Sequence, residues 1–349
     1  MKILHTSDWH IGHQVSGIDR YDEYELFFDW LRDIINKENI ELLIISGDIF
    51  DVYNPSNKAL EQYYDFLATL KIKTVIIGGN HDSPKTLEAP KEVLKHINVD
   101  VISGGRENYK KIIEFDDFTL LAVSYLRENI LGPDLLESIK EIYKISSKKP
   151  VIATGHMSVY GASLGGGERE IYIGKIEAVP STLFEDFNYT ALGHIHKYQK
   201  IKENIVYSGS PLQMAFDENY DKKIVIIDTE DFQTKTVTVP KFRKFIKLKG
   251  TFEEIYEEIK KHNSYELKPF AEIELRDNSS SEDIQALKEA ADFHILKIKL
   301  PLILSQNSGL DIKAMNFDEI IKNIFENDED LDEIIKIINE IKTEIKEEK

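Results

Sequence analysis

The sequence predicts an α/β fold, a two-sheet α/β sandwich followed by a small α+β domain and a pair of helices. Apolar strand-like runs alternate with amphipathic helices from residue 1 to about residue 240, and from about Thr190 short strands joined by turns suggest a second sheet packed on the first. In addition, five apolar runs each stop at a side chain that can bind a metal ion. These runs are KILHTS, ELLIISG, TVIIGG, VIATG and YTALG.

Two helices in the first part of the chain are predicted from apolar side chains at helical spacing, over residues 24–35 and 57–70. The second helix is rich in aromatic residues. It therefore either lies deep in the core or pairs two subunits through its spare face. The later short strands are expected at residues 199–201, 205–208, 222–227 and 235–239.

A small α+β domain is predicted after Pro240, where the pattern becomes strand, helix, strand, helix, strand. These elements are expected at residues 245–248, 251–261, 270–275, 281–291 and 293–300. Thr251 with Glu254, and Ser281, mark the starts of the two helices. Two amphipathic helices follow a polar stretch, and they either pack on their own protein or dock on a partner helix. We therefore expect domains at residues 1–240 and 241–304, and a helical segment at 310–349.

Length and composition describe a soluble protein of more than one domain. The chain has 349 residues, of which 42% are hydrophobic and 30% charged, values typical of folded globular proteins. It has no cysteine, so disulfides and thiolate ligands are excluded and any metal is bound through nitrogen and oxygen. The first strand starts at Lys2 without a signal peptide, and no apolar run approaches the ~20 residues that span a bilayer. We therefore expect a cytoplasmic protein that does not enter a membrane.

The net charge of −18 argues against nonspecific binding of nucleic acid, which usually depends on a basic surface. Part of this acidity is local. From Leu310 onward there are thirteen acidic residues against six lysines, so this segment carries −7 and the rest of the chain −11. A centre with two divalent ions, two aspartates and a hydroxide has a charge of about +1, which attracts a phosphodiester.

Side chains with metal-binding atoms follow each of the five apolar runs. They are Asp8, His10, Asp48, Asn80, His156, His194 and His196. A single Asp or His after a strand is more often a turn residue or helix cap, but five such endings favour a shared two-metal site at the carboxyl edge of one sheet. In segments 8–10 and 194–196 the candidates are two residues apart, so in extended backbone they point the same way. The histidines without such a setting, expected to be ordinary strand, loop or surface residues, are His5, His13, His96, His262 and His294.

The donor types indicate both the metal and the chemistry. Several histidines with carboxylates and one amide favour manganese, iron or zinc over magnesium, which prefers oxygen ligands. Asp48 is the natural bridging ligand because its strand lies between the other two amino-terminal strands. Two ions ~3.5–4 Å apart clamp a phosphate, lower the pKa of a water and stabilise the attacking and leaving oxygens. We therefore expect hydrolysis of a phosphoester.

Two further groups are predicted to act beside the metals. In extended backbone, His81 points away from the ion that Asn80 binds and towards the substrate phosphate. Asp51 follows Asp48 by three residues and could accept the imidazole N–H of His81. That bond would raise the pKa of His81 and fix its tautomer for protonating the leaving oxygen. The alternative is that Asp51 is a helix or turn cap.

Five motifs, in order over the first 200 residues, resemble the signature of calcineurin-like metallophosphoesterases. They are Asp8-x-His10, Gly47-Asp48-x-x-Asp51, Gly79-Asn80-His81-Asp82, Gly155-His156 and Gly193-His194-x-His196. The segments SDWHIG, GERxIYIG, ALGHIHKYQ and YSGSPLQMAFDE resemble, more specifically, the SbcD family of DNA repair nucleases. The similarity extends through the small domain, which would correspond to the DNA-binding capping domain of that family.

The resemblance implies two metal sites. The first would be held by Asp8, His10, Asp48 and His196, and the second by Asp48, Asn80, His156 and His194. It also implies two manganese ions, with magnesium, iron or zinc possible in part. The activity would be a 3′ to 5′ exonuclease on duplex DNA ends and an endonuclease on single strands and hairpins.

The same resemblance implies partners. Members of this family form homodimers and work with an SbcC-type ATPase of the structural-maintenance class, whose coiled coil they bind through carboxyl-terminal helices. Residues 317–345 could serve that purpose here. The protein would then associate with the nucleoid when it is on DNA.

Six basic residues in predicted loops near the site are candidates for phosphate contacts. The alternative for each is an ordinary surface charge in contact with solvent. The six residues are Arg20, Lys85, Arg106, Arg127, Arg169 and Lys197. Two other functions stay open. A phosphodiesterase or phosphomonoesterase for a small molecule would suit the acidic surface, although such a substrate needs no separate second domain. A non-catalytic scaffold would retain the fold, although such proteins lose ligands by substitution and none is missing here.

Overall fold

The computed structural model describes residues 1–105, 108–125, 137–139, 141–142, 149–163, 178–261 and 265–301. Met1–Leu300 form one compact unit and Pro301–Lys349 a second. The predicted carboxyl-terminal helical pair lies outside the described residues.

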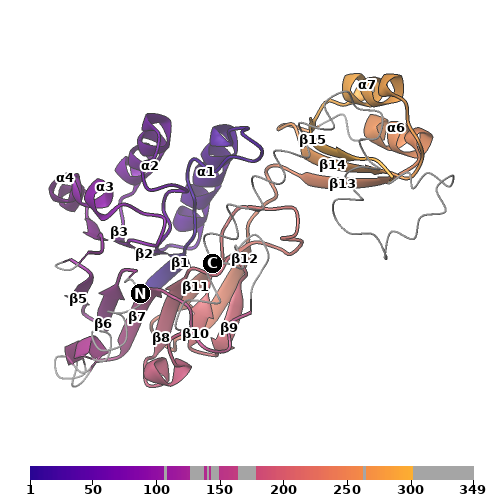
Figure 1. Ribbon diagram of the computed structural model, residues 1–349. Coiled ribbons are helices and arrows are strands. Elements are labelled where there is room, and N and C mark those ends of the chain that lie inside the picture. Colours follow the sequence, from indigo (N-terminus) through magenta and orange to yellow (C-terminus); the bar gives the residue numbers. More distant parts are fainter. Residues whose placement is uncertain are drawn as a thin grey trace, which may run out of the picture. The chain divides into compact units, whose positions relative to one another are not determined.

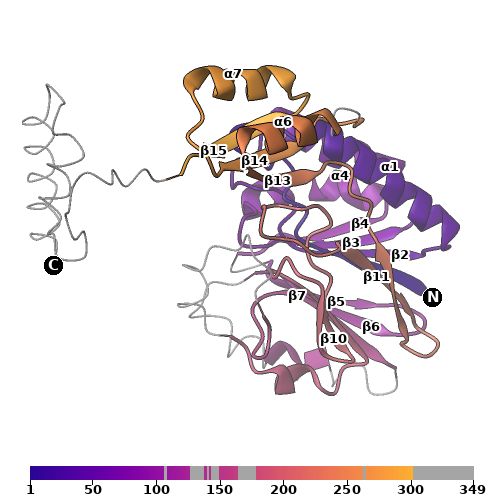
Figure 2. The same ribbon diagram turned by 90° about the vertical axis from the view of Figure 1, so that its right-hand side faces the viewer.

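Two six-stranded sheets pack face to face (Figure 1, Figure 2). The first has the order β12-β11-β1-β2-β3-β4, with β1 Lys2–Thr6, β2 Leu42–Ser46, β3 Lys73–Ile77, β4 Val99–Ile102, β11 Lys223–Asp228 and β12 Thr234–Thr238. The second has the order β5-β6-β7-β8-β10-β9, with β5 Lys110–Glu114, β6 Thr119–Val123, β7 Val151–His156, β8 Tyr189–Gly193, β9 Gln199–Lys202 and β10 Ile205–Tyr207. The predicted two-sheet sandwich is therefore confirmed.

The assignment of the late strands to sheets differs from the prediction. Strands β9 and β10 extend the second sheet, as expected, but β11 and β12 return to the first sheet. There β11 runs antiparallel to β1, with Ile227 opposite Ile3. The local pattern of each late strand indicates a strand but does not reveal which neighbour it pairs with.

The sandwich core lies between the two sheets and explains the continuous apolar runs. All five residues of β2 are buried, as expected for a strand that is covered on both faces. Ile44 and Val75 of the first sheet belong to one buried cluster with Ile152 and Ala191 of the second. Burial of whole strands leaves their polar ends as the points where the chain can present chemical groups.

Helices cover the outer face of the first sheet (Figure 2). The predicted helices are confirmed as α1 Tyr21–Lys37 and α2 Asn57–Thr69. Ser56 caps α2 by accepting a hydrogen bond from the Ala59 amide at 3.1 Å. Tyr63 and Phe66 of α2 are buried in the same cluster as Trp9. The aromatic character of α2 therefore reflects burial in the core.

A third sheet of three parallel strands follows, made of β13 Phe245–Gly250, β14 Phe270–Leu275 and β15 His294–Lys299. Helices α6 Phe252–Lys261 and α7 Ser281–Ala290 lie on one face of it (Figure 1). Thr251 and Glu254 form the predicted capping box, with bonds of 3.0 and 3.3 Å. For α7 the cap is Ser280 with Asp283, one residue earlier than the predicted Ser281.

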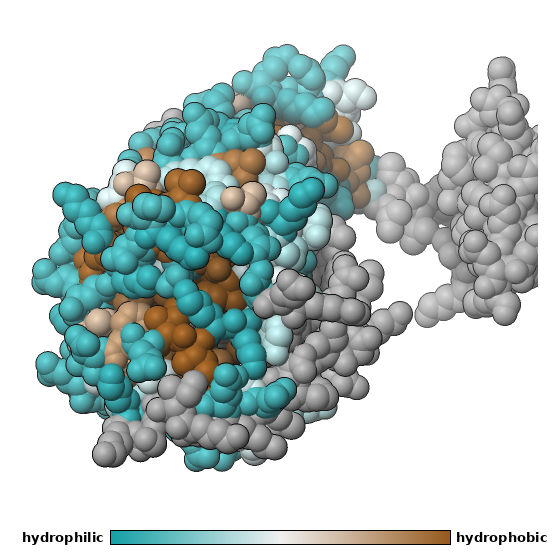
Figure 3. All heavy atoms as spheres, turned by 90° about the vertical axis from the view of Figure 1, so that its left-hand side faces the viewer, coloured by the Kyte–Doolittle hydropathy of each residue, from teal (hydrophilic) through white to brown (hydrophobic). Residues whose placement is uncertain are grey.

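The face on the left of Figure 1 carries α3 Pro84–Glu88 and α4 Lys91–His96 and mixes apolar patches with hydrophilic side chains (Figure 3). On α4, Val93 is 70% exposed. Single exposed apolar residues are usual on folded proteins, so this face alone does not locate a subunit contact. Among the described residues, no helix combines the length and the apolar character needed to cross a bilayer.

His5 on β1 is a buried histidine that the fold keeps uncharged, and this should make the stability of the protein depend on pH. Its Nε2 donates to the Leu192 carbonyl at 3.2 Å, which leaves Nδ1 to accept from the Tyr189 hydroxyl at 2.9 Å. Burial lowers the pKa of His5 from 6.5 to about 3, against the opposing effect of the Leu192 bond. In the unfolded chain this histidine takes up a proton below pH 6.5, so its contribution to stability is complete above that pH and falls as the pH drops towards about 3.

We therefore expect a less pH-sensitive stability in a His5→Gln variant. Between pH 6.5 and about 3 the wild-type free energy of unfolding should fall more steeply than that of the variant, by about 1.4 kcal/mol per pH unit. Urea unfolding across this interval measures the two slopes, with His96→Gln on exposed α4 as a control. Parallel slopes for wild type and His5→Gln would contradict the assignment.

Candidate metal centre

The structure brings together the seven predicted ligands where five strands end. Strands β1, β2 and β3 belong to the first sheet and β7 and β8 to the second, so the prediction of a single sheet edge is wrong. The two sheets meet here through direct contacts, since the His156 ring of β7 donates from Nδ1 to the Ser46 carbonyl of β2 at 2.8 Å. Strand β2 does lie between β1 and β3, as predicted.

The backbone at the site is left-handed, not extended. Four of the predicted ligands have positive φ, namely Asp8 at 53°, His10 at 49°, Asp48 at 50° and His194 at 101°. Residues other than glycine rarely adopt this conformation, and such strain concentrates at functional sites. The prediction that segments 8–10 and 194–196 align their side chains through extended backbone is therefore wrong.

Hydrogen bonds between two loops hold this strained backbone in place. The loop after β1 pairs with the loop after β2 through the amides of Asp8, His10 and Ile11, which donate to the carbonyls of the β2 loop at 2.9, 3.0 and 2.8 Å. The Asp82 carboxylate braces the next loop. It accepts from the amides of Gly79 at 2.8 Å and Phe50 at 3.0 Å. Burial, reinforced by the Asp48 charge, raises the pKa of Asp82 to about 6.

Glycines beside the ligands allow the close approach of the two sheets. Gly47 has φ of 87°, and a Cβ at this position would overlap the His156 ring. A Cβ on Gly193 would overlap the Ser46 carbonyl. Only glycine fits both positions, which gives a physical reason for the Gly-Asp and Gly-His pairs in the sequence.

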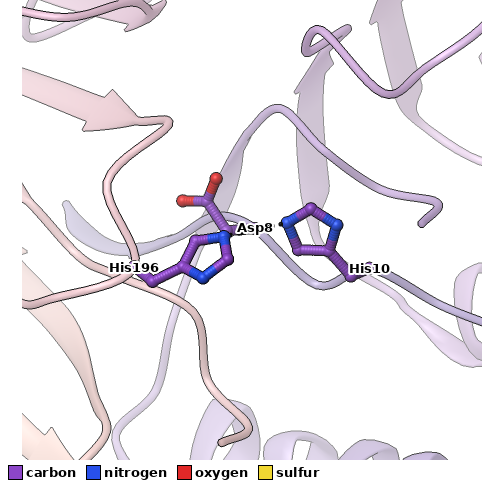
Figure 4. A group of neighbouring side chains, drawn as sticks. All are labelled: Asp8, His10 and His196. Atoms are coloured by element: carbon purple, nitrogen blue, oxygen red, sulfur yellow. Dashed lines mark hydrogen bonds between the residues drawn. The ribbon is translucent and has the colours of Figure 1, made fainter. Parts of the chain in front are cut away.

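The first group of donors consists of Asp8, His10 and His196, whose ligand atoms lie within 4.8 Å of one another. Figure 4 shows the two imidazole rings pointing toward each other with the Asp8 carboxylate beside them. Nδ1 of His196 donates to a Glu218 oxygen at 2.9 Å, and Nδ1 of His10 faces an Asp51 oxygen at 3.4 Å. His196 therefore has a proton on Nδ1, and its Nε2 lies 3.2 Å from Nε2 of His10. Two imidazole nitrogens and a carboxylate this close together are donors that a transition-metal ion uses, so this donor set fits a metal ion.

The second group surrounds His156. Its Nδ1 donates to a carbonyl, and its Nε2 lies 2.9 Å from Asn80 Oδ1 and 3.3 Å from Asp48 Oδ2. Nδ1 of His194 also lies 2.9 Å from Asn80 Oδ1. Burial lowers the pKa of His156, but the Asp48 carboxylate outweighs burial and raises it to about 9. A metal ion binding here must therefore displace a proton.

Asp48 connects the two groups through one oxygen. Its Oδ2 lies 3.7 Å from Nε2 of His10 and 3.3 Å from Nε2 of His156. Its Oδ1 accepts from the backbone amide of His81 at 2.9 Å. The carboxylate is thus oriented with Oδ2 directed to both groups, which is the geometry a bridging ligand requires.

The predicted contact between His81 and the Asp51 side chain is not present. His81 Nδ1 donates instead to the backbone carbonyl of Asp51, at 2.6 Å. The Asp51 carboxylate faces His13 Nδ1 at 3.0 Å and His10 Nδ1 at 3.4 Å. His81 is exposed, and its ring packs edge-on against His10 with centroids 4.8 Å apart. The prediction paired the correct two residues, but the acceptor is the backbone carbonyl of Asp51 and not its carboxylate. The chain turns after Asp48 and directs the Asp51 side chain toward His13 and His10.

Sequence reasoning missed two residues that support the ligands. His13 was expected to be an ordinary residue, yet it contacts Asp51. Glu218 is 1% exposed, and its carboxylate accepts from His196 through one oxygen and from Lys222 and the Met214 amide, both at 2.7 Å, through the other. Burial raises the pKa of Glu218, but the bond to His196 and the charge of Lys222 outweigh it and lower the pKa to about 2. The partners of His13 are distant in the sequence, so no local pattern marks it. Glu218 ends the segment YSGSPLQMAFDE, but nothing in that segment indicates its contact with His196, 22 residues earlier.

The candidate phosphate contacts lie in different settings. Arg20 is 1% exposed and donates twice to Glu23, at 2.8 and 2.7 Å, so it is a structural residue and not a surface contact. Lys85 is exposed on α3, and Lys197 is half-buried with Nζ 5.8 Å from the Tyr220 ring centroid. The other three candidates, which lie outside the described residues, are Arg106, Arg127 and Arg169.

We expect Glu218→Gln to weaken metal binding. The amide can still accept from His196, but it no longer provides the charge that keeps the imidazole proton on Nδ1. Loss of such an outer partner typically costs about 10–100-fold in metal affinity. Isothermal titration with Mn²⁺ measures the change in affinity. Urea unfolding checks that loss of the buried ion pair with Lys222 has not unfolded the protein. An affinity equal to that of wild type would show that Glu218 does not orient His196.

Comparison with known proteins identifies the family of this chain. Residues 1–198 match the family of calcineurin-like phosphoesterases. The chain is 29% identical over 340 residues to SbcD of the SbcCD nuclease of Escherichia coli strain K12, covering 86% of this chain and 85% of the relative. It is 28% identical over 395 aligned residues to SbcD of the SbcCD nuclease of Bacillus subtilis strain 168, covering 100% and 99%. The corresponding protein of Rhodobacter capsulatus is 32% identical over 268 residues, covering 65% and 66%.

Proposed function

Because the chain belongs to the calcineurin-like phosphoesterase family, we propose that it is a two-metal, manganese-dependent DNA phosphodiester hydrolase. The observation that carries this proposal is the single Asp48 oxygen directed at imidazole nitrogens of two donor groups. The relatives named as components of a nuclease, which match over most of their length, support DNA as the substrate. Manganese suits the mixture of imidazole, carboxylate and amide donors.

Each protein group has a defined task in this mechanism. When bound, a pair of divalent ions would clamp the phosphate and supply the nucleophile. Asp48 would hold both ions, and the carboxylates of Glu218 and Asp51 would orient the ligands His196 and His10. His81 stands at the exposed mouth with its Nδ1 proton donated to the Asp51 carbonyl, so the doubly protonated ring would carry on Nε2 the proton that passes to the leaving oxygen.

The finer activity is also a proposal. We infer 3′ to 5′ exonuclease action on duplex ends and endonuclease action on single strands and hairpins, with Lys85 and Lys197 as phosphate contacts. The third sheet would be the core of a capping domain at residues 241–304 that helps to bind DNA, after a nuclease domain at 1–240. The protein would act in the cytoplasm, on the nucleoid, as a homodimer. Sedimentation of the purified chain measures its subunit number.

A partner ATPase is the remaining part of the proposal. The relatives are named as one component of a nuclease called SbcCD, and this supports an SbcC-type partner for the present chain. We propose that residues 310–349 bind it. Deleting these residues should abolish co-purification with the ATPase while leaving metal binding intact, and unchanged co-purification would refute the assignment.

One set of assays separates the proposed function from its alternatives. The purified chain is incubated with hairpin DNA, blunt duplex DNA, an aryl phosphodiester and an aryl phosphomonoester, with Mn²⁺ or with a chelator. We expect cleavage of both DNAs with Mn²⁺ and none with the chelator. Cleavage of the aryl esters alone would support a small-molecule phosphoesterase, which the net charge of −18 favours. No metal uptake and no cleavage would support a scaffold.

A further inference from the structure

We propose that His13 is a positioning residue, which holds Asp51 in place and through it the metal ligand His10 and the proton donor His81. This inference rests on the proposed function for the role of His81, and on geometry alone for the role of His10. His13 lies at the end of the turn that follows the first two ligands, where its amide donates to the His10 carbonyl at 2.9 Å.

The side chain of His13 joins loops from three parts of the chain. It belongs to the loop after β1, its Nδ1 lies 3.0 Å from Asp51 Oδ1 in the loop after β2, and its Nε2 lies 3.2 Å from the Met214 carbonyl in the loop after β10. The last of these loops also carries Glu218, the partner of His196. His13 thus links Asp51, which faces His10, to the loop that carries Glu218, the partner of His196.

Asp51 needs such an anchor because its segment is otherwise open to solvent. Val52 and Tyr53, the next two residues, are 51% and 55% exposed. The Asp51 amide donates to the Ile11 carbonyl at 3.2 Å and its carbonyl accepts from His81, but neither backbone bond fixes the side chain. The bond from His13 fixes the carboxylate. With the carboxylate fixed, the same residue can face His10 Nδ1 with its side chain and accept from His81 with its carbonyl.

A direct contact with substrate is the competing interpretation of His13. The residue also lines a cleft of about 540 Å³, together with Met214, Phe216, Phe245 and Lys247. If His13 touched the substrate there, its loss would weaken substrate binding and leave metal binding unchanged. If it positions Asp51, its loss would weaken metal binding and lower kcat, with KM little changed.

The two ring nitrogens of His13 can be tested separately. The amide nitrogen of asparagine takes the place of Nδ1, and that of glutamine the place of Nε2. His13→Asn therefore keeps the contact with Asp51, whereas His13→Gln keeps only the contact with the Met214 carbonyl. We expect His13→Gln and His13→Ala to lower Mn²⁺ affinity and kcat on hairpin DNA by about 10-fold or more, and His13→Asn to stay within about twofold of wild type. His96→Ala, on exposed α4, is the matched control.

A double-mutant cycle tests whether His13 acts through Asp51. In an Asp51→Ala background, His13→Ala should change Mn²⁺ affinity by less than about twofold. Equal losses in both backgrounds, equal effects of Asn and Gln, or a rise in KM with unchanged metal affinity would each overturn the proposal. If wild type and variants bind Mn²⁺ in the expected order but none cleaves DNA, the positioning role stands and the proposed function fails.

Discussion

Replacing Asp48 with asparagine should remove at least one of two metal ions per subunit. It should also lower turnover by more than about 100-fold, which exceeds the effect of changing a residue that only orients a ligand. The reason is the position of Asp48 Oδ2, which faces the donor groups of both ions. An amide in its place carries no charge, and if its nitrogen took the Oδ2 position it would direct hydrogens at both ions. The variant therefore loses the shared anion that allows two cations to lie close together.

Elemental analysis of the dialysed protein and kcat on hairpin DNA measure the two effects. Asp65→Asn is a matched control, since it makes the same chemical change on an exposed position of α2. Asp48 also accepts from the His81 amide, and the asparagine oxygen can keep that bond. The variant is therefore expected to fold. Two ions per subunit and near-normal turnover in Asp48→Asn would show that this carboxylate is not the bridge.

Replacing His81 with asparagine should leave both metals bound and lower kcat on DNA by about 10²–10⁴-fold, the usual contribution of a general acid. His81 donates to a carbonyl of the protein and stands exposed at the mouth of the site, so its loss removes a proton donor without disturbing the buried ligands. The effect should depend on the leaving group. An aryl phosphodiester, whose leaving oxygen needs no proton, should be hydrolysed by the variant at a rate much closer to that of wild type.

The comparison of the two substrates is therefore the decisive measurement for His81, and metal content is its companion. His96→Asn provides the same substitution at an exposed histidine remote from the site. An equal loss on both substrates would indicate that His81 acts on the metals instead, a role open to it because its ligand atom lies within 4.8 Å of those of His10 and Asp48. Normal turnover on DNA would remove it from the mechanism.

Much of the fold was predictable because its causes are local. A strand that is covered on both faces is largely apolar, so β1, β2, β3, β7 and β8 were found from their apolar runs. The helices α1 and α2 were found from the spacing of their apolar residues, and the α6 capping box from Thr251 and Glu254. The strand β2 could likewise be placed between β1 and β3 because parallel neighbours often follow one another in sequence.

Other features could not be predicted, because they depend on contacts between distant segments. Whether β11 joins the first or the second sheet depends on the open edge that β1 offers, which no window of sequence contains. The positive φ of Asp8, His10 and Asp48 is imposed by amide bonds between two loops. Local pattern predicted extended backbone there, and the paired loops overrode it.

The sequence by itself determined which residue types stand at the strand ends, and hence that nitrogen and oxygen donors of a metal site are present in the chain. Tertiary structure decided which atoms face which. It brought donors from two sheets together, assigned the Asp51 carbonyl to His81, and placed His13 and Glu218 behind the ligands. The physical reason is range: burial and periodicity act between near neighbours in sequence, whereas a hydrogen bond such as that of His13 to Met214 joins residues 201 positions apart.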